Sequence, residues 1–351
     1  MLYISIFNVL VLLSIITPHR RQLSYKVYLV CSVCLFTFAA FRWQVGCDWS
    51  GYFNQYLIQA ENSWSDVLEM REPLWWGILE LQHIFGLPYP WINVASSLIF
   101  FIGLHLVARR QPSAISFLAL SFPILIVNMP MTAMRQGAAI GIMCYAFLNF
   151  IDRKTLAFTL LVLLAGLVHN SALVFIFLVP LCGGHFSPAR ILLAIILFVP
   201  GVFVLLGTSG ADRAVSLYID QDTDSQGAIF RNLFLILTSL LFFLFCAKKW
   251  RNIYPDDYRL ALVGAVGMSL VAPVLLLSTV VADRFGYYLV PIQCMIFARL
   301  PYLMLGRSKI ILIALPYIGL FALFTYWALN SQHFNTCYMP YQSWLIGVPG
   351  G

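Results

Sequence analysis

The sequence predicts an all-α, polytopic membrane protein. Of its 351 residues, 61% are hydrophobic and only 10% are charged, with a mean hydropathy of +0.86. This composition excludes a soluble globular protein. Long apolar runs such as Ile191–Leu206 and Leu233–Cys246 show no alternation of polar and apolar residues, which favours helices over the strands of a barrel.

Positive side chains in the short loops determine the predicted topology. The first loop carries His19, Arg20, Arg21 and Lys26, which places it in the cytoplasm and the N-terminus outside. Met1–Ile16 is interpreted as a retained first span, since basic residues follow it and no cleavage site does. The net charge of +7 comes from cations in short loops that orient the chain in the membrane, so it does not indicate nucleic-acid binding. Membrane lipids are the expected partners of this charge.

About ten transmembrane helices are expected, with both termini outside. Their approximate ranges are 1–16, 27–41, 91–108, 114–127, 137–150, 191–206, 229–247, 259–280, 285–302 and 310–329. We expect one integral membrane domain over residues 1–351, with outer loops at 42–88 and 208–228.

Two apolar stretches do not fit single crossings. Leu74–Phe85, inside the 42–88 loop, has about 12 residues and is too short to cross ~30 Å of hydrocarbon, so a re-entrant or interfacial helix is predicted. If residues 155–181 crossed the membrane once, Lys248, Lys249 and Arg251 would lie outside, against the rule that positive loops stay in the cytoplasm. A broken helical hairpin over residues 155–181 returns these cations to the cytoplasmic side. Its turn is expected at His169-Asn170-Ser171, because Asn and Ser favour turns.

With this topology, the polar clusters gather on the face away from the cytoplasm. They comprise Arg42, Asp48, Arg71, Glu72, Arg135, Gln136, Asp283 and Arg284, with His169 close by. Charge is scarce in this chain, so its concentration on one face indicates an outward-facing active site.

Two arginines are candidate ligands for an anion. Arg135-Gln136 opens a span, where a cation opposes the helix dipole, which suggests an anion shared with the backbone N–H groups; the alternative is an interfacial arginine on lipid phosphate. Asp283-Arg284 is expected at a second outward helix start, where the alternative is pairing with each other or with a neighbouring helix. Arg135 and Arg284 together would suit a pyrophosphate, because each guanidinium binds oxygens bidentately.

The 42–88 loop combines carboxylates with aromatic residues. Asp48 stands beside Trp49 and Tyr52, and Glu72 is followed by Trp75. Aromatic rings stack on sugars, so Trp49, Tyr52 and Trp75 are predicted sugar-binding residues. Membrane anchoring by tryptophan, and a capping or helix-dipole role for Glu72, are the alternatives.

His169 lies within a long apolar stretch, where an ionisable side chain is costly and usually faces a cavity with a partner. It is a candidate base or hydrogen-bond donor; the alternative is a histidine satisfied by a carbonyl at the helix break.

Three other features are weaker indicators of function or structure. Asp222-Thr-Asp224 matches a metal-binding D-x-D but lacks the strand-rich nucleotide-binding fold that such motifs need, so no metal and no cofactor are expected. Cys47 and Cys337 both map to the outer face, where one prediction is a disulfide. Gly137 and Gly141 predict close helix packing.

In order and spacing, these motifs resemble the bacterial O-antigen and exopolysaccharide polymerases of the Wzy/EpsG type. The similar pieces span about residues 42 to 290: Arg42 before Gly46, Asp48, Trp49 and Tyr52; Glu72-Pro73; Met134-Arg135-Gln136; His169-x-Ser171-Ala172-Leu173; and Asp283-Arg284-Phe285. Trp49 stands where Tyr is expected, and Asn170 where Lys is common.

The resemblance implies a glycosyltransferase of the bacterial inner membrane that joins oligosaccharide repeat units outside the cytoplasm. Donor and acceptor would be carried on polyprenyl pyrophosphate, with a flippase and a chain-length regulator as possible partners. Arg135, Gln136 and Arg284 would bind the pyrophosphate, and Asp48, Glu72 or His169 would be the base. The alternatives are a ligase-like glycosyltransferase, for which the 208–228 loop is short, and a flippase or transporter, for which neither repeats nor mid-membrane charges are evident.

Overall fold

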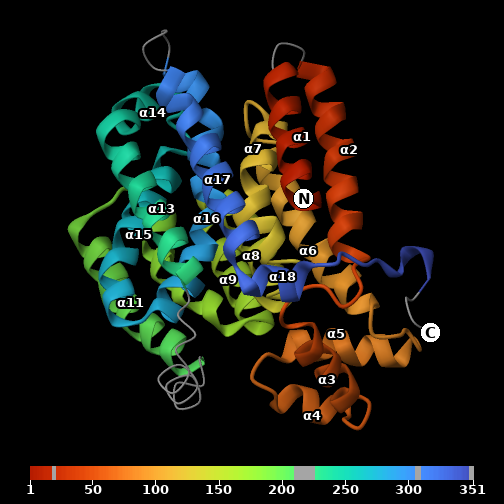
Figure 1. Ribbon diagram of the computed structural model, residues 1–351. Helices are drawn as coiled ribbons and strands as arrows, with labels where there is room; N and C mark the ends of the chain where they lie inside the picture. Colours follow the sequence, from red (N-terminus) through yellow and green to blue (C-terminus); the bar gives the residue numbers. More distant parts are fainter. Residues whose placement is uncertain (18–20, 209–225, 305–309, 348–351) are drawn as a thin grey trace. The chain divides into compact units, whose positions relative to one another are not determined.

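The computed structural model describes residues 1–17, 21–208, 226–304 and 310–347. Throughout these residues the regular secondary structure is helical, and the single extended pairing is an isolated antiparallel bridge between Arg42 and Ser343. The predicted all-α class is confirmed. Figure 1 shows the helices coloured along the chain.

The described chain divides into two compact units, one formed by residues 1–142, 167–169 and 314–351, the other by residues 143–166 and 170–313. The first unit holds α1 (Leu2–Ile16), α2 (Arg21–Ala40), α3 (Trp49–Gln59), α4 (Trp64–Glu69), α5 (Pro73–Ile84), α6 (Trp91–Ala108), α7 (Ala114–Ser121), the π-helix η1 (Phe122–Ile126), α18 (Gln332–Tyr338) and η5 (Trp344–Ile346). It also holds the start of α8 (Met134–Ile151) and most of α17 (Ile310–Asn330).

Close packing of α6 on α8 anchors the site-bearing helix of the first unit. A Cβ atom added to Gly103 would lie 1.9 Å from the carbonyl oxygen of Gly141, and one added to Gly141 would meet the backbone of Ile99 and Phe100. The helices approach this closely only because both positions lack a side chain. The expectation that Gly141 serves helix packing is confirmed.

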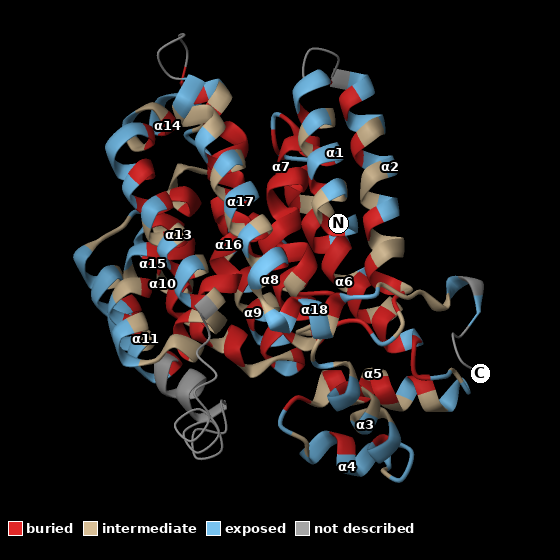
Figure 2. Cartoon of the chain, viewed as in Figure 1, coloured by how far each residue is buried: buried red, intermediate tan, exposed pale blue. Residues whose placement is uncertain are grey.

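α7 forms the buried centre of the first unit. It contacts α1, α2 and α6, and all of its residues are buried, as the red colour of Figure 2 shows. It passes into the π-helix η1 at Phe122–Ile126, where Pro123 cannot donate the backbone hydrogen bond of a regular helix.

The 42–88 segment contains three short helices, α3, α4 and α5, where one was predicted. α5 runs over Pro73–Ile84, 12 residues, within a residue of the expected bounds at each end. α3 and α4 both contact α5, and the three lie together in Figure 1. Pro73 starts α5, since proline at the first helical position loses no hydrogen bond.

The second unit contains α9 (Thr155–Val168, to Gly166), η2 (Asn170–Leu178), α10 (Val179–Cys182), α11 (Pro188–Thr208), α13 (Gln226–Leu241), η3 (Phe242–Cys246), α14 (Ala247–Ile253), α15 (Tyr258–Leu277) and α16 (Thr279–Leu303). Within it α13, α15 and α16 pack on one another, and α11 packs on η2.

The predicted broken hairpin is present. α9 ends at Val168, His169 is non-helical, and η2 begins at Asn170. A Cβ atom on Gly183 would lie 2.6 Å from Oγ1 of Thr155, and one on Gly166 would meet the side chain of Leu173. The chain therefore returns alongside α9 instead of continuing as one rod.

Five helices of the described chain are long and apolar enough to cross a membrane: Gln22–Ala40, Trp91–Ala108, Gly227–Ile253, Tyr258–Leu277 and Ile310–Asn330. Shorter apolar helices cover five more segments, among them Leu2–Ile16 and Ala114–Ile126. The protein is a multi-pass, all-α membrane protein, while the count of about ten crossings stays a prediction. Most of the predicted 208–228 loop, with Asp222 and Asp224, lies outside the described residues.

Candidate functional site

Three side chains from distant parts of the sequence meet in the first unit. The carboxylate of Glu72 accepts a hydrogen bond from Nη1 of Arg135 at its Oε2 atom and lies against Nδ1 of His169 at its Oε1 atom, both at 2.6 Å. Each oxygen therefore holds one of two nitrogen groups. Sequence analysis placed all three residues on one face, and the structure brings them into contact.

Glu72 is directed toward these partners by the start of α5. It occupies the N-cap position before Pro73, but its side chain makes no capping hydrogen bond to the helix. The carboxylate turns instead to Arg135 and His169. The capping alternative for Glu72 is therefore wrong.

Arg135 is the second residue of α8, as the sequence predicted for a helix start. Its backbone N–H donates to the Tyr52 hydroxyl at 3.4 Å, and its guanidinium carbon lies 5.9 Å from the centre of that ring. Burial raises the pKa of Tyr52, so the phenol stays protonated at neutral pH. The unfavourable position of a cation at this helix end is offset by the Glu72 carboxylate.

His169 occupies the break between α9 and η2, where the chain turns. There its Nδ1 atom contacts a carboxylate, whereas the alternative interpretation invoked a backbone carbonyl. The side chains of Glu72 and His169 are 8% and 12% exposed, and that of Arg135 is 32% exposed. The group is thus a largely buried carboxylate between two nitrogen groups, of which the arginine side chain is partly exposed.

This arrangement can perform two kinds of chemistry. The guanidinium of a partly exposed arginine can bind and neutralise an anionic oxygen. A histidine whose Nδ1–H donates to a carboxylate carries its lone pair on Nε2 and is oriented to accept a proton there. Both groups share one carboxylate, so their positions are linked.

Three more residues of the predicted site lie in the first unit. Asp48 is exposed at the start of α3, Trp49 is half-buried, and Gln136 is buried beside Arg135. These positions do not test the predicted roles of Asp48 as a base and of Trp49 as a sugar-binding residue, so both roles stay predictions.

Two sugar-binding predictions are corrected. Trp75 is 0% exposed, and its indole N–H donates to Oε1 of Gln55 at 2.9 Å. Tyr52 packs on Trp75 with ring centres 5.4 Å apart and is 6% exposed. Both belong to a hydrophobic core with Leu79 and Met134, so neither ring presents a face for a sugar to stack on. The aromatic pattern in this loop reflects packing of α3 on α5.

Arg284 belongs to the second unit and Arg135 to the first, so the predicted clamp between them stays a prediction. The prediction that Arg284 lies at a helix start is wrong. α16 begins at Thr279, so Arg284 lies in its second turn. Its neighbour Asp283 is held by Arg231 of α13, whose Nε and Nη2 atoms donate to the two carboxylate oxygens at 3.1 and 2.8 Å. The alternative that Asp283 pairs with a neighbouring helix is confirmed.

Sequence analysis missed Arg231. Its guanidinium also lies 5.3 Å from the centre of the Tyr287 ring. The signal that could have identified Arg231 is its position just inside the apolar stretch that begins near residue 229. Charged residues within apolar helices are usually paired or functional.

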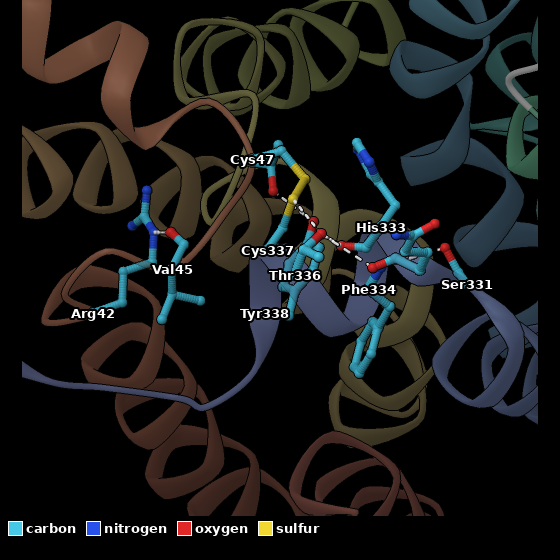
Figure 3. Close-up of a disulfide and its surroundings, with 11 residues drawn as sticks. Arg42, Val45, Cys47, Ser331, His333, Phe334, Thr336, Cys337 and Tyr338 are labelled. Carbon is cyan, nitrogen blue, oxygen red and sulfur yellow. Dashed lines mark hydrogen bonds between the residues drawn. A yellow bond between two sulfur atoms is a disulfide. The ribbon is translucent and has the colours of Figure 1, made fainter. Parts of the chain in front are cut away.

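Cys47 and Cys337 form a disulfide with their Cα atoms 4.8 Å apart, which confirms the predicted pairing. Figure 3 shows it joining the loop after Arg42 to α18. The imidazole of His333 offers a ligand atom within 4.8 Å of the two sulfur atoms. With both sulfurs in the disulfide, this group lacks the thiolates that a metal ion would need.

Arg42 is the first residue of the motifs that resemble the polymerase family. It is 2% exposed and contacts the loop that carries Cys47. Its Nε atom donates to the carbonyl oxygens of Val45 and Met131, both at 3.0 Å, and its Nη1 atom donates to that of Ala39. It thus holds the end of α2 against the segment that precedes α8. In this structure Arg42 has a structural role.

The chain belongs to the EpsG family, which it matches over residues 25–343. This family supports a role of the polysaccharide-polymerase type, with glycosyltransferase-like chemistry. No curated protein matches the chain, and no solved structure does.

Proposed function

We propose that this protein polymerises oligosaccharide repeat units carried on polyprenyl pyrophosphate, at the face of the bacterial inner membrane that is turned away from the cytoplasm. The observation that carries the proposal is the Glu72 carboxylate shared by Arg135 and His169. It combines an anion-binding cation with an oriented base, which are the two groups that transfer from a pyrophosphate leaving group requires.

In this proposal Arg135 binds the departing pyrophosphate. The bond between the anomeric carbon and the phosphate oxygen breaks, and negative charge grows on that oxygen. Arg135 is partly exposed and its charge is constant at physiological pH, so it neutralises this charge without a proton transfer.

His169 acts as the base. Donation from Nδ1 to Glu72 leaves the lone pair on Nε2, which takes the proton from the acceptor sugar hydroxyl as that oxygen attacks the anomeric carbon. Glu72 is the orienting residue, because both of its oxygens already hold nitrogen groups. The exposed Asp48 is then assigned no proton transfer.

The disulfide supports the proposed side of the membrane. Disulfides persist in oxidising compartments and are rare in the cytoplasm. The Cys47–Cys337 bond joins the loop between α2 and α3 to α18, and Gly46, next to Cys47, lies against Met131 just before α8. The disulfide and the charge pattern of the short loops both support an extracytoplasmic position for these segments.

The test is the polysaccharide profile of cells that carry Arg135→Ala, His169→Ala or wild-type protein at equal abundance. We expect both variants to lose long chains and to leave single repeat units exposed outside the cell. Removal of one charge-stabilising donor typically costs about 10²–10³ in rate. Accumulation of repeat units on the cytoplasmic side would instead identify a transporter, and unchanged long chains would refute the proposed site.

A further inference from the structure

The C-terminal segment from Ser331 to Ile346 lies across the loops that lead into the candidate site. α18 contributes Cys337 to the disulfide, and the backbone N–H of Gly46 donates to the Cys337 carbonyl at 2.7 Å. Further along, the N–H of Trp43 donates to the Gln342 carbonyl, next to the isolated bridge of Ser343. We call residues 331–346 the C-terminal strap.

Two side chains of the strap add contacts to the end of α2. The Tyr341 hydroxyl donates to the Phe38 carbonyl at 2.8 Å, and the Ser343 hydroxyl donates to the Phe41 carbonyl at 2.7 Å. The ring of Tyr341 also stacks on Phe38, with centres 4.3 Å apart. The strap is therefore attached at Cys337 and again at residues 341–343, on the C-terminal side of the disulfide.

From the strap, contacts lead directly to the start of α8. The hydroxyl of Tyr338, a residue 1% exposed, hydrogen-bonds to that of Thr132. The carbonyl of Thr132 in turn accepts from the N–H of Met134, the first residue of α8. Arg135 follows immediately.

The neighbouring loop is equally tight. Gly46 has φ +101°, and a Cβ atom there would lie 1.8 Å from the Met131 carbonyl oxygen. That same oxygen accepts from Arg42. The backbone before α8 is thus held between Arg42 and Gly46 on one side and Tyr338 on the other.

We propose that the C-terminal strap, locked by the Cys47–Cys337 disulfide, positions Arg135 for the reaction, with Tyr338 and Thr132 as positioning residues. This inference rests on the proposed function, since it assigns Arg135 a role in turnover. It concerns residues outside the group formed by Glu72, Arg135 and His169. A displacement of about 1 Å at a reacting group can cost about 10² in rate, so a small shift of the first turn of α8 is enough.

The first experiment compares Thr132→Val with Thr132→Ser. Valine has the shape of threonine without the hydroxyl, whereas serine keeps it. With lipid-linked repeat units extracted from a polymerase-deficient strain as substrate, we expect Thr132→Val and Tyr338→Phe to lower kcat about tenfold with KM changed less than about twofold. Thr132→Ser should retain the wild-type kcat.

The second measurement does not depend on activity. Amide hydrogen exchange in the first turn of α8 should become about tenfold faster in Thr132→Val and in the Cys47→Ser, Cys337→Ser double variant, with exchange in α13 unchanged. A membrane-impermeant phosphine reductant should reproduce the effect in the wild-type protein and have none in the double variant.

These outcomes separate the two proposals. If Arg135→Ala abolishes polymerisation while Thr132→Val changes neither kcat nor exchange in α8, the strap proposal is overturned and the proposed function stands. If exchange rises as expected but Arg135→Ala still polymerises at the wild-type rate, the proposed function fails, and with it the role of the strap in turnover.

Discussion

Replacement of Glu72 by Gln tests the candidate site most directly. Glutamine keeps the shape of the side chain but offers one acceptor oxygen and one donor NH₂ group where the carboxylate offers two acceptors. Arg135 and His169 both require an acceptor in the observed arrangement. Arg135 can only donate, so it keeps the amide oxygen, and Nδ1 of His169 must then accept from the NH₂ group, which moves the imidazole proton to Nε2 and removes the lone pair there.

The size of the effect follows from burial. Hydrogen bonds to charged groups contribute about 1.5–3 kcal/mol each. Glu72 and His169 are 8% and 12% exposed, so their contact is worth a value within this range, whereas Arg135 is about one-third exposed and solvent screens its share. We expect Glu72→Gln to destabilise the protein by about 2–3 kcal/mol. Loss of an oriented base should lower turnover by about 10²–10⁴.

The assay pairs chain-length distribution in cells with thermal unfolding of purified protein in detergent. Glu80→Gln is the matched control, because Glu80 lies on the same helix and its Oε2 atom accepts from Gln59 at 2.9 Å, a bond that glutamine can retain. The control should polymerise normally. Wild-type chain length with unchanged unfolding in Glu72→Gln would show that the shared carboxylate neither orients His169 nor holds Arg135.

Three further predictions test individual assignments. Arg135→Lys should keep partial activity, about tenfold reduced, because lysine retains the charge without the bidentate geometry, and a turnover no better than that of Arg135→Ala would contradict this reasoning. Gly103→Ala should lower the unfolding temperature in detergent, because its Cβ would overlap the Gly141 carbonyl, while Gly51→Ala, with open space around it, should not. Trp75→Phe should preserve polymer length but destabilise by about 1–2 kcal/mol through the lost indole hydrogen bond; shortened polymer in a stably folded variant would restore its sugar-binding role.

Several elements of the fold could be predicted because their signals are local. Hydropathy alone placed α6 at Trp91–Ala108, and a run of about 12 residues indicated the short α5. The break at His169 followed from turn-forming residues in an apolar stretch, together with the loop charges. Each of these signals lies within one segment and needs no knowledge of its neighbours.

Pairing between distant segments could not be predicted in the same way. The sequence indicated Glu72, Arg135 and His169 as candidates on one face but did not rank them, since separations of 63 and 97 residues carry no geometric signal. Trp75 illustrates the same limit: an aromatic residue beside a carboxylate suits either a sugar platform or a packed core, and only the contact with α3 decided for the core.

By itself, the sequence determined that this is an all-α membrane protein with scarce charges gathered in a few motifs, because composition and hydropathy act on each segment separately. The tertiary structure decided which of these charges touch: one carboxylate, Glu72, holds both Arg135 and His169, and Asp283 is held by Arg231. The physical reason is that a buried charge is stabilised by partners within about 3 Å, and those partners are chosen by the packing of helices far apart in the chain.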